Sequence, residues 1–178
     1  MTSILVTHDQ EEALSMADRI VVLNQGQVEQ TDIPTRIYDN PASLFVNRFV
    51  GHTNLVAGKL TRAAGPTCTV QLNCGPTLDL KAPNGLGTGA NVLVSIRPEN
   101  LRVAAGPGPY TIPATARLNL PLGPVDVLEA VTADGLGIKL TFPHQRQSEV
   151  IGPGAVVHLQ IVDLEACSLF PDSTAVHH

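Results

Sequence analysis

Aromatic and basic side chains are scarce in this sequence. It has no tryptophan, two tyrosines and four phenylalanines, and its 11 lysines and arginines are outnumbered by 16 aspartates and glutamates, for a net charge of −5. Proteins bind single-stranded nucleic acid by stacking bases on aromatic side chains in basic grooves, and they bind duplexes by neutralising phosphates. The scarcity of both residue types argues against a nucleic-acid partner.

Long apolar runs and paired cysteines are also missing. No run approaches the roughly 18–20 apolar residues of a membrane-spanning helix, and the N-terminus lacks the basic and then apolar pattern of a signal peptide. The three cysteines, Cys68, Cys74 and Cys167, form no Cys-x-x-Cys pair, which favours reduced thiols over a disulfide or a zinc site. We therefore expect a soluble, cytoplasmic protein without a metal site, which reaches a membrane only through other proteins.

Residues 1–50 have the pattern of a mixed α/β segment. The apolar run Ser3 to Thr7 predicts a buried strand. Asp9 is placed to cap a helix that continues to about Ala17. Residues 19–30 read as a hairpin around an Asn-Gln-Gly turn, and Pro34 and Pro41 are each placed to open a short helix.

After residue 50 the periodicity changes to that of strands. Apolar and polar residues alternate with period two over residues 92–97, 138–142 and 157–162. Gly-Pro-Gly and Asp-Gly turn signals separate these runs, among 15 glycines and 14 prolines in the whole chain. The sequence therefore predicts a mostly β fold, a barrel or sandwich over residues 51–178, preceded by an α/β segment over residues 1–50.

Several segments resemble one family of ATPases. Residues 5–13, LVTHDQEEA, resemble the switch-histidine region of ABC-transporter ATPases, and the similarity continues through ADRIVVL at 17–23 to FVGHTN at 49–54. Residues 94–100, VSIRPEN, resemble the best-marked strand of the TOBE domain. The chain thus resembles the C-terminal part of an ATP-binding subunit of the ABC-importer subfamily that serves sugar, polyamine, sulfate, ferric-ion and phosphonate uptake.

The resemblance implies a domain organisation. Residues 1–50 would be the C-terminal tail of a nucleotide-binding domain, an incomplete α/β segment. Residues 51–178 would be an OB-like (TOBE) β-barrel with a regulatory and dimerising role. Partners would be a second copy, through the β domain, and the transmembrane permease subunits, which would hold the full-length protein at the cytoplasmic face of the inner membrane.

The resemblance also assigns a role to His8, as the switch histidine that contacts the γ-phosphate of ATP in the intact protein only. The assignment is physically reasonable, because a histidine at the end of a buried strand can hydrogen-bond a γ-phosphate and help to position the attacking water. Such chemistry depends on positioning and electrostatics, so it requires the rest of the phosphate site.

That phosphate site has no counterpart in these residues. The sequence contains no G-x-x-x-x-G-K-[ST] loop, Walker B strand or signature sequence, and the glycine-rich residues Gly85 to Gly89 read as a turn between strands. We therefore expect the full-length parent to use ATP and Mg²⁺, and this chain, an expressed fragment or truncated reading frame, to bind neither and to be inactive as an ATPase.

Two alternatives remain at this stage. The β domain could be an oxyanion or small-ligand sensor whose site is lined by Arg97, Arg102, Arg117 and Lys139. The chain could also be a complete small hydrolase centred on His8, with Asp9, Glu11 and Glu12 beside it. The hydrolase is disfavoured, because side chains on one helical turn point in different directions and make no nucleophile–base pair.

Overall fold

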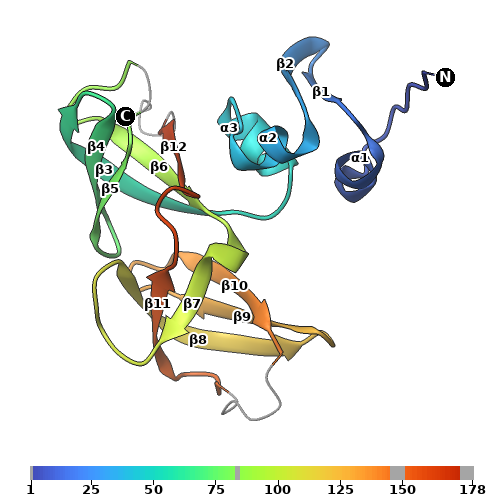
Figure 1. Cartoon of the computed structure of the whole chain (residues 1–178). Helices are drawn as coiled ribbons and strands as arrows, with labels where there is room; N and C mark the ends of the chain where they lie inside the picture. Colours follow the sequence, from blue (N-terminus) through green and yellow to red (C-terminus); the bar gives the residue numbers. More distant parts are fainter. Residues whose placement is uncertain (1, 83–84, 145–150, 173–178) are drawn as a thin grey trace. The chain divides into compact units, whose positions relative to one another are not determined.

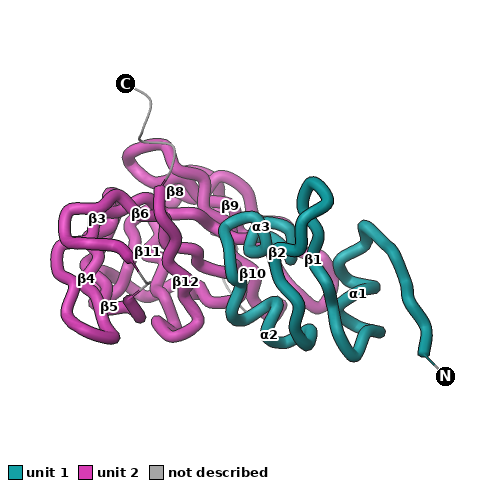
Figure 2. The backbone as a smooth tube through the Cα atoms, turned by 90° about the horizontal axis from the view of Figure 1, so that it is seen from above, with its two compact units in different colours: residues 1–52 teal, residues 53–178 magenta. Residues whose placement is uncertain are grey.

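The structure is a computed structural model that describes residues 2–82, 85–144 and 151–172. The chain divides into two compact units, residues 1–52 and 53–178 (Figure 2). Each unit has its own cluster of buried hydrophobic residues. The two units are therefore described one at a time.

The first unit contains short helices around a two-stranded hairpin. Its elements are α1 (Gln10–Met16), β1 (Ile20–Asn24), β2 (Gln27–Asp32), α2 (Pro34–Asp39) and α3 (Leu44–Phe49). The β1–β2 turn places Gln25 and Gly26 at φ 49° and 81°, a pair of left-handed residues of the kind that matches the twist of a hairpin. Val22, Ile37, Val46 and Val50 form the small core of this unit.

Most local predictions for the first unit are confirmed, with two corrections. Asp9 caps α1, the hairpin is present, and α2 opens at Pro34 as expected. The helix expected to open at Pro41 instead begins at Leu44, because the Ser43 hydroxyl accepts a hydrogen bond from the Val46 N–H at 3.3 Å and caps it.

The strand predicted over Ser3–Thr7 does not form, and that prediction is wrong for this structure. Ile4 and Val6 are 91% and 93% exposed. A strand is stabilised by hydrogen bonds to its neighbours, and the described residues place no strand beside this run. An apolar run of this kind therefore forms a strand only where neighbouring strands pair with it.

The second unit is built from antiparallel strands (Figure 1). They are β3 (Asn54–Ala64), β4 (Thr67–Leu72), β5 (Thr77–Lys81), β6 (Asn91–Ile96), β7 (Leu101–Ala104), β8 (Thr111–Pro121), β9 (Val125–Val131), β10 (Gly137–Pro143), β11 (Val156–Ile161) and β12 (Ser168–Pro171), with a 3₁₀ turn, η1, at Pro98–Asn100. In the described part of the chain they form two five-stranded sheets, ordered β12-β6-β3-β4-β5 and β10-β9-β8-β11-β7. The edge strands of each sheet approach one another, so each sheet curls towards a half-barrel.

The two sheets are two copies of one pattern. Strands β3–β6 correspond to β8–β11, and each copy has a bulge at the same place, at Thr61 and at Arg117. In both copies the residue before the bulge donates its N–H to a carbonyl just before the fourth strand, Leu60 to Ala90 at 2.9 Å and Ala116 to Ala155 at 2.8 Å. The sequence repeats here as well, with GTGANVLVSI at 87–96 and GPGAVVHLQI at 152–161.

Each copy is completed by a strand from the other half of the chain. Strand β7 follows the first copy but pairs with β11 of the second, and β12 follows the second copy but pairs with β6 of the first. Figure 1 shows the red β12 alongside the yellow-green β6. This exchange ties the two sheets together, so neither copy is complete without the other.

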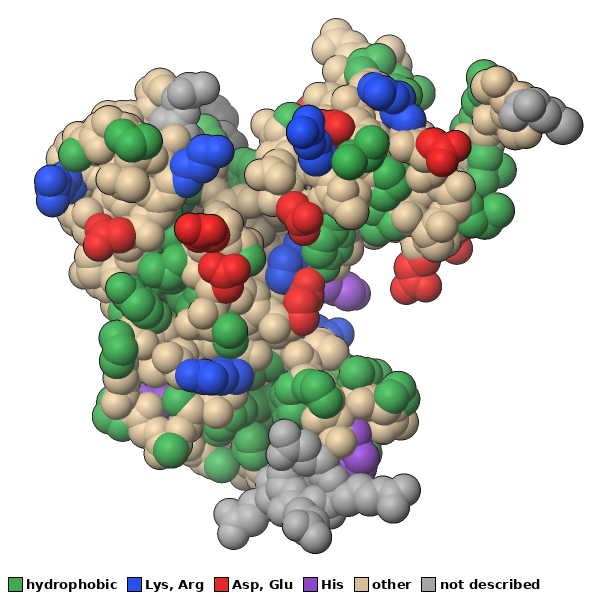
Figure 3. Space-filling view, in the orientation of Figure 1, with side chains coloured by type: hydrophobic (Ala, Val, Ile, Leu, Met, Phe, Trp, Pro, Cys, Tyr) green, Lys and Arg blue, Asp and Glu red, His purple; other side chains and the backbone are tan. Residues whose placement is uncertain are grey.

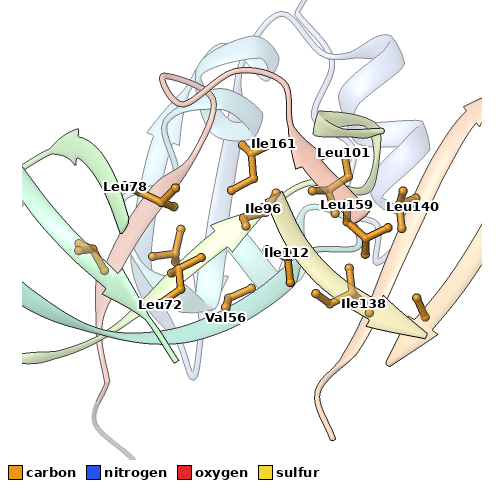
Figure 4. Packing of buried hydrophobic residues seen from close by; sticks show 14 of the residues in the cluster. Val56, Leu72, Leu78, Ile96, Leu101, Ile112, Ile138, Leu140, Leu159 and Ile161 are labelled. Carbon is orange, nitrogen blue, oxygen red and sulfur yellow. The ribbon is translucent and has the colours of Figure 1, made fainter. Parts of the chain in front are cut away.

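One continuous core lies between the sheets. Figure 4 shows Val56 and Leu72 of one sheet in the same cluster as Ile112 and Leu159 of the other. The runs that alternate in the sequence supply this core, since Val92, Val94 and Ile96 are all buried, as are their counterparts Val157, Leu159 and Ile161. The mostly β, OB-like fold class is confirmed; the duplication and strand exchange were not predicted.

Candidate functional site

His8 lies in an exposed segment just before α1. Asp9 holds the start of that helix, because its Oδ1 accepts from the Glu12 N–H at 3.1 Å, and its own N–H donates to the Thr7 hydroxyl at 3.0 Å. Asp9 is therefore occupied as the helix cap that the sequence predicted. The local structure orders the start of α1 around His8 without bringing a nucleophile or base to it.

Two further features bear on a nucleotide site, the metal-ligating side chains and the glycine-rich segment. Over the described ranges no cluster of three or more His, Cys, Asp or Glu residues is arranged to hold a metal ion. The glycine-rich segment at 85–89 is a turn, as predicted: its Gly89 N–H donates to the Leu60 carbonyl at 2.6 Å, and strand β6 follows it. Since the Gly89 amide pairs with a neighbouring strand and β6 follows in place of a helix, the segment lacks the loop-to-helix arrangement that cradles a phosphate.

All three thiols have a raised pKa. Burial, reinforced by the nearby Asp134, raises the pKa of Cys74 to about 11, and burial with the nearby Asp163 raises the pKa of Cys167 to about 12. Burial also raises the pKa of Cys68. All three are therefore neutral at physiological pH, whereas the thiolate is the reactive form.

The four basic side chains expected to line an anion site do not all lie together in the structure. Arg97 is buried beside η1, and Arg102 on β7 donates from Nε and Nη2 to the Gln160 Oε1 at 3.0 and 2.7 Å. Arg117 and Lys139 line one pocket. The structure therefore brings together two of the four residues.

That pocket lies on the second sheet and has a volume of about 350 Å³. It is lined by Asn54, Arg117, Glu129, Ala130, Val131, Gly135, Gly137, Ile138 and Lys139. The volume is near the lower end of the range of small-molecule sites, roughly 300–1,000 Å³. A molecule of a few carbon atoms with several polar groups would suit it.

Asn54 fixes one wall of the pocket. Its Nδ2 donates to the Lys139 carbonyl at 2.8 Å and to the Ile96 carbonyl at 3.1 Å, and its Oδ1 accepts from the Lys139 N–H at 2.8 Å. Strand β3 of one sheet thereby holds strand β10 of the other sheet at Lys139. Because these bonds use the whole amide, Asn54 positions the pocket instead of offering a free group to a ligand.

Three charged residues lie side by side along the pocket, one on each of three adjacent strands. Lys139 on β10 is directly opposite Glu129 on β9, and Arg117 occupies the β8 bulge next to the residue opposite Glu129. Within the residues that the structure describes, no side-chain nitrogen of Lys139 or Arg117 lies within 4.0 Å of a Glu129 carboxylate oxygen. The charges alternate without pairing.

Sequence reasoning missed Glu129 and Asn54. Glu129 belongs to the site only because the β9–β10 register places it opposite Lys139, and Asn54 is 85 positions away from Lys139 in the chain. The signal that could have led to them is the internal repeat at 87–96 and 152–161, from which the strand register of one half can be transferred to the other.

Comparison with known proteins places the chain among transport subunits. No family model matches the sequence. It is 39% identical over 144 residues, 81% of this chain, to the spermidine/putrescine import ATP-binding protein PotA 1 of Pseudomonas aeruginosa. It is 37% identical over 150 residues, 82% of this chain, to the sulfate/thiosulfate import ATP-binding protein CysA of Ralstonia nicotianae. The chain spans 39% and 40% of the length of these relatives.

A solved structure supports the fold of the β domain. The cytoplasmic molybdate-binding protein ModG superposes with a TM-score of 0.55 and 13% identity, covering 67% of this chain and 96% of that one. At this identity the match shows the fold alone, a TOBE-like one. Together with the two import subunits, it leads to one conclusion: this chain is homologous to the C-terminal regions of the ATP-binding subunits of ABC importers.

Proposed function

We propose that this chain is the C-terminal regulatory and dimerisation region of the ATP-binding subunit of an ABC importer, in which the full-length protein couples ATP hydrolysis to solute uptake. The observation that carries the proposal is a similarity that extends over about four fifths of the chain, 81% and 82%, to import subunits named for unrelated solutes. A region shared between polyamine and sulfate subunits serves a common step of transport better than it serves choice of solute.

In this proposal residues 1–50 are the end of the nucleotide-binding domain, with His8 as its switch histidine, and residues 51–178 are the TOBE domain. The exposure of Ile4, Val6 and Met16 supports it, because in the intact protein the rest of the nucleotide-binding domain would cover these apolar side chains. ATP and Mg²⁺ would be bound mainly by those other segments, so the 178 residues alone do not hydrolyse ATP.

The full-length protein would act at the cytoplasmic face of the membrane through permease subunits. Across the described residues, none of the helices combines the length and the apolar character that crossing a bilayer demands. Within each of the two units, Figure 3 shows both acidic and basic side chains on the face that it draws. Both observations are compatible with contact to the membrane through other proteins.

Dimerisation is assigned to the second unit. Leu118, Leu120 and Leu122, along the end of β8 and the turn after it, are exposed, and a self-complementary apolar patch is what a two-fold interface requires. Light scattering on the chain should give twice its 18.8 kDa. The double substitution Leu120→Ser/Leu122→Ser should give the monomer mass, whereas Val28→Ser on β2 of the first unit should not.

A chimera tests the proposed role in transport. The aligned C-terminal region of the Pseudomonas PotA 1 subunit is replaced by residues 2–178 of this chain, and spermidine uptake is measured in cells that lack the native subunit. The chimera should restore uptake. A second chimera that ends at residue 52, and so lacks the β domain, should differ from the parent subunit in its assembly and in its regulation. A chimera that is expressed and folded, yet supports no uptake while the parent does, would count against the proposal.

A further inference from the structure

The duplication provides an internal comparison for the pocket. The strand registers match Thr61, Thr69 and Asp79 of the first copy to Arg117, Glu129 and Lys139 of the second. In the first copy these polar groups bond to one another: the Thr69 hydroxyl donates to the Asp79 carboxylate at 2.7 Å, and the Thr61 hydroxyl donates to the Thr69 carbonyl at 3.1 Å. The fold therefore does not need three charges of alternating sign at these positions, since the first copy has two threonines and one aspartate there.

In the second copy the same three positions carry charges that line the pocket of about 350 Å³. Adjacent strands lie about 4.7–4.9 Å apart, so the positive, negative and positive groups of Lys139, Glu129 and Arg117 follow one another across β10, β9 and β8. The first copy adopts the same strand arrangement without this alternation of charge, so the fold does not require it.

The pocket is held on rigid elements. Two hydrogen bonds of Asn54 hold the Lys139 backbone and a third reaches the Ile96 carbonyl, and the bulge sets the backbone at Arg117. Strands and buried hydrogen bonds therefore fix the backbone from which the three charged side chains project, so the pocket keeps its shape when a ligand arrives. Preorganisation of this kind favours a specific site over a chance grouping of surface charges.

The charge pattern defines the ligand. A simple anion that bridges Lys139 and Arg117 would lie over the Glu129 carboxylate, and a simple amine would face two cations. The complementary pattern is two anionic groups on either side of an ammonium group, carried by one small molecule of net charge −1. We propose that the pocket binds an amino-dicarboxylate of the size of glutamate, with Lys139 and Arg117 on its carboxylates and Glu129 on its ammonium group.

Calorimetric titration of the 178-residue chain tests this site, and it does not depend on the proposed function, since binding is measured without the importer. The probes are L-glutamate, glutarate, which lacks the ammonium group, 4-aminobutyrate, which lacks one carboxylate, and sulfate. Glutamate should bind one per chain and more tightly than each other probe by about tenfold or more, because each other probe lacks at least one charge-assisted hydrogen bond that glutamate makes.

Variants identify the pocket. Arg117→Gln and Lys139→Gln should each weaken glutamate binding by about tenfold or more, and Glu129→Gln should remove the preference for glutamate over glutarate. Arg102→Gln, which alters an exposed arginine outside the pocket, should bind as the parent does. Circular dichroism melting confirms that each variant is folded. No binding of glutamate, equal binding of sulfate or glutarate, or equal weakening by Arg102→Gln would overturn the proposal.

Discussion

Removal of the Asn54 side-chain amide should strongly lower the free energy of unfolding of the β domain. Asn54 is 6% exposed and makes three hydrogen bonds, two of them to Lys139 in the other sheet. A net hydrogen bond contributes about 0.5–1.5 kcal/mol, so Asn54→Ala should lower the free energy of unfolding by roughly 2–4 kcal/mol. That is a large share of the roughly 5–15 kcal/mol by which domains are stable.

Urea unfolding followed by circular dichroism is the appropriate assay, because the chain has no tryptophan. With an m-value of about 1–3 kcal/mol per molar urea, the midpoint should fall by roughly 1–2 M. Asn91→Ala, at an exposed position at the start of β6, is the matched control and should change the free energy by less than about 0.5 kcal/mol. A loss for Asn54→Ala no larger than that of the control would refute the idea that Asn54 joins the two sheets.

Two further predictions concern packing and pH. Gly58→Ala would place a methyl group 2.7 Å from the Gln71 carbonyl oxygen and 3.0 Å from Val70 Cγ1, so it should lower the free energy of unfolding by about 1–3 kcal/mol in chemical denaturation. Gly87→Ala, where the added methyl group would meet no heavy atom within 4 Å, is the control and should be near neutral. Equal effects of the two substitutions would contradict this packing. The pKa of Cys167 is raised from 9.0 to about 12, so its contribution to stability is complete below pH 9 and is lost as the pH rises towards 12. The urea midpoint should therefore fall less steeply between pH 8 and about 10.5 for Cys167→Ala than for the parent, and parallel curves would contradict this.

The parts of the fold that the sequence predicted are those set by local interactions. The cap at Asp9 and the hairpin around Gln25 and Gly26 depend on neighbours within a few residues. The alternation over 157–161 reports directly which side chains are buried, namely Val157, Leu159 and Ile161. In each case the physical cause lies within one segment of sequence.

The parts that were missed depend on distant segments. The run at 3–7 has the composition of a strand, but the described residues give it no neighbour. The exchange of β7 and β12 between the two sheets cannot be read from either strand alone. Likewise Glu129 lies beside Arg117 and Lys139 only because of the strand register. That register depends on pairing between separate strands, so no single segment of sequence predicts the pocket.

The central claim, that this chain supplies the C-terminal region of an importer ATPase with His8 as its switch histidine, is tested most directly by ATP hydrolysis in the assembled chimeric importer. His8→Ala should reduce the rate by roughly a hundredfold or more, as loss of a group that stabilises the transition state does. His158→Gln on β11, outside any proposed nucleotide contact, should leave the rate close to that of the unsubstituted chimera. An assembled His8→Ala importer that hydrolyses ATP as fast as the unsubstituted one would contradict the account.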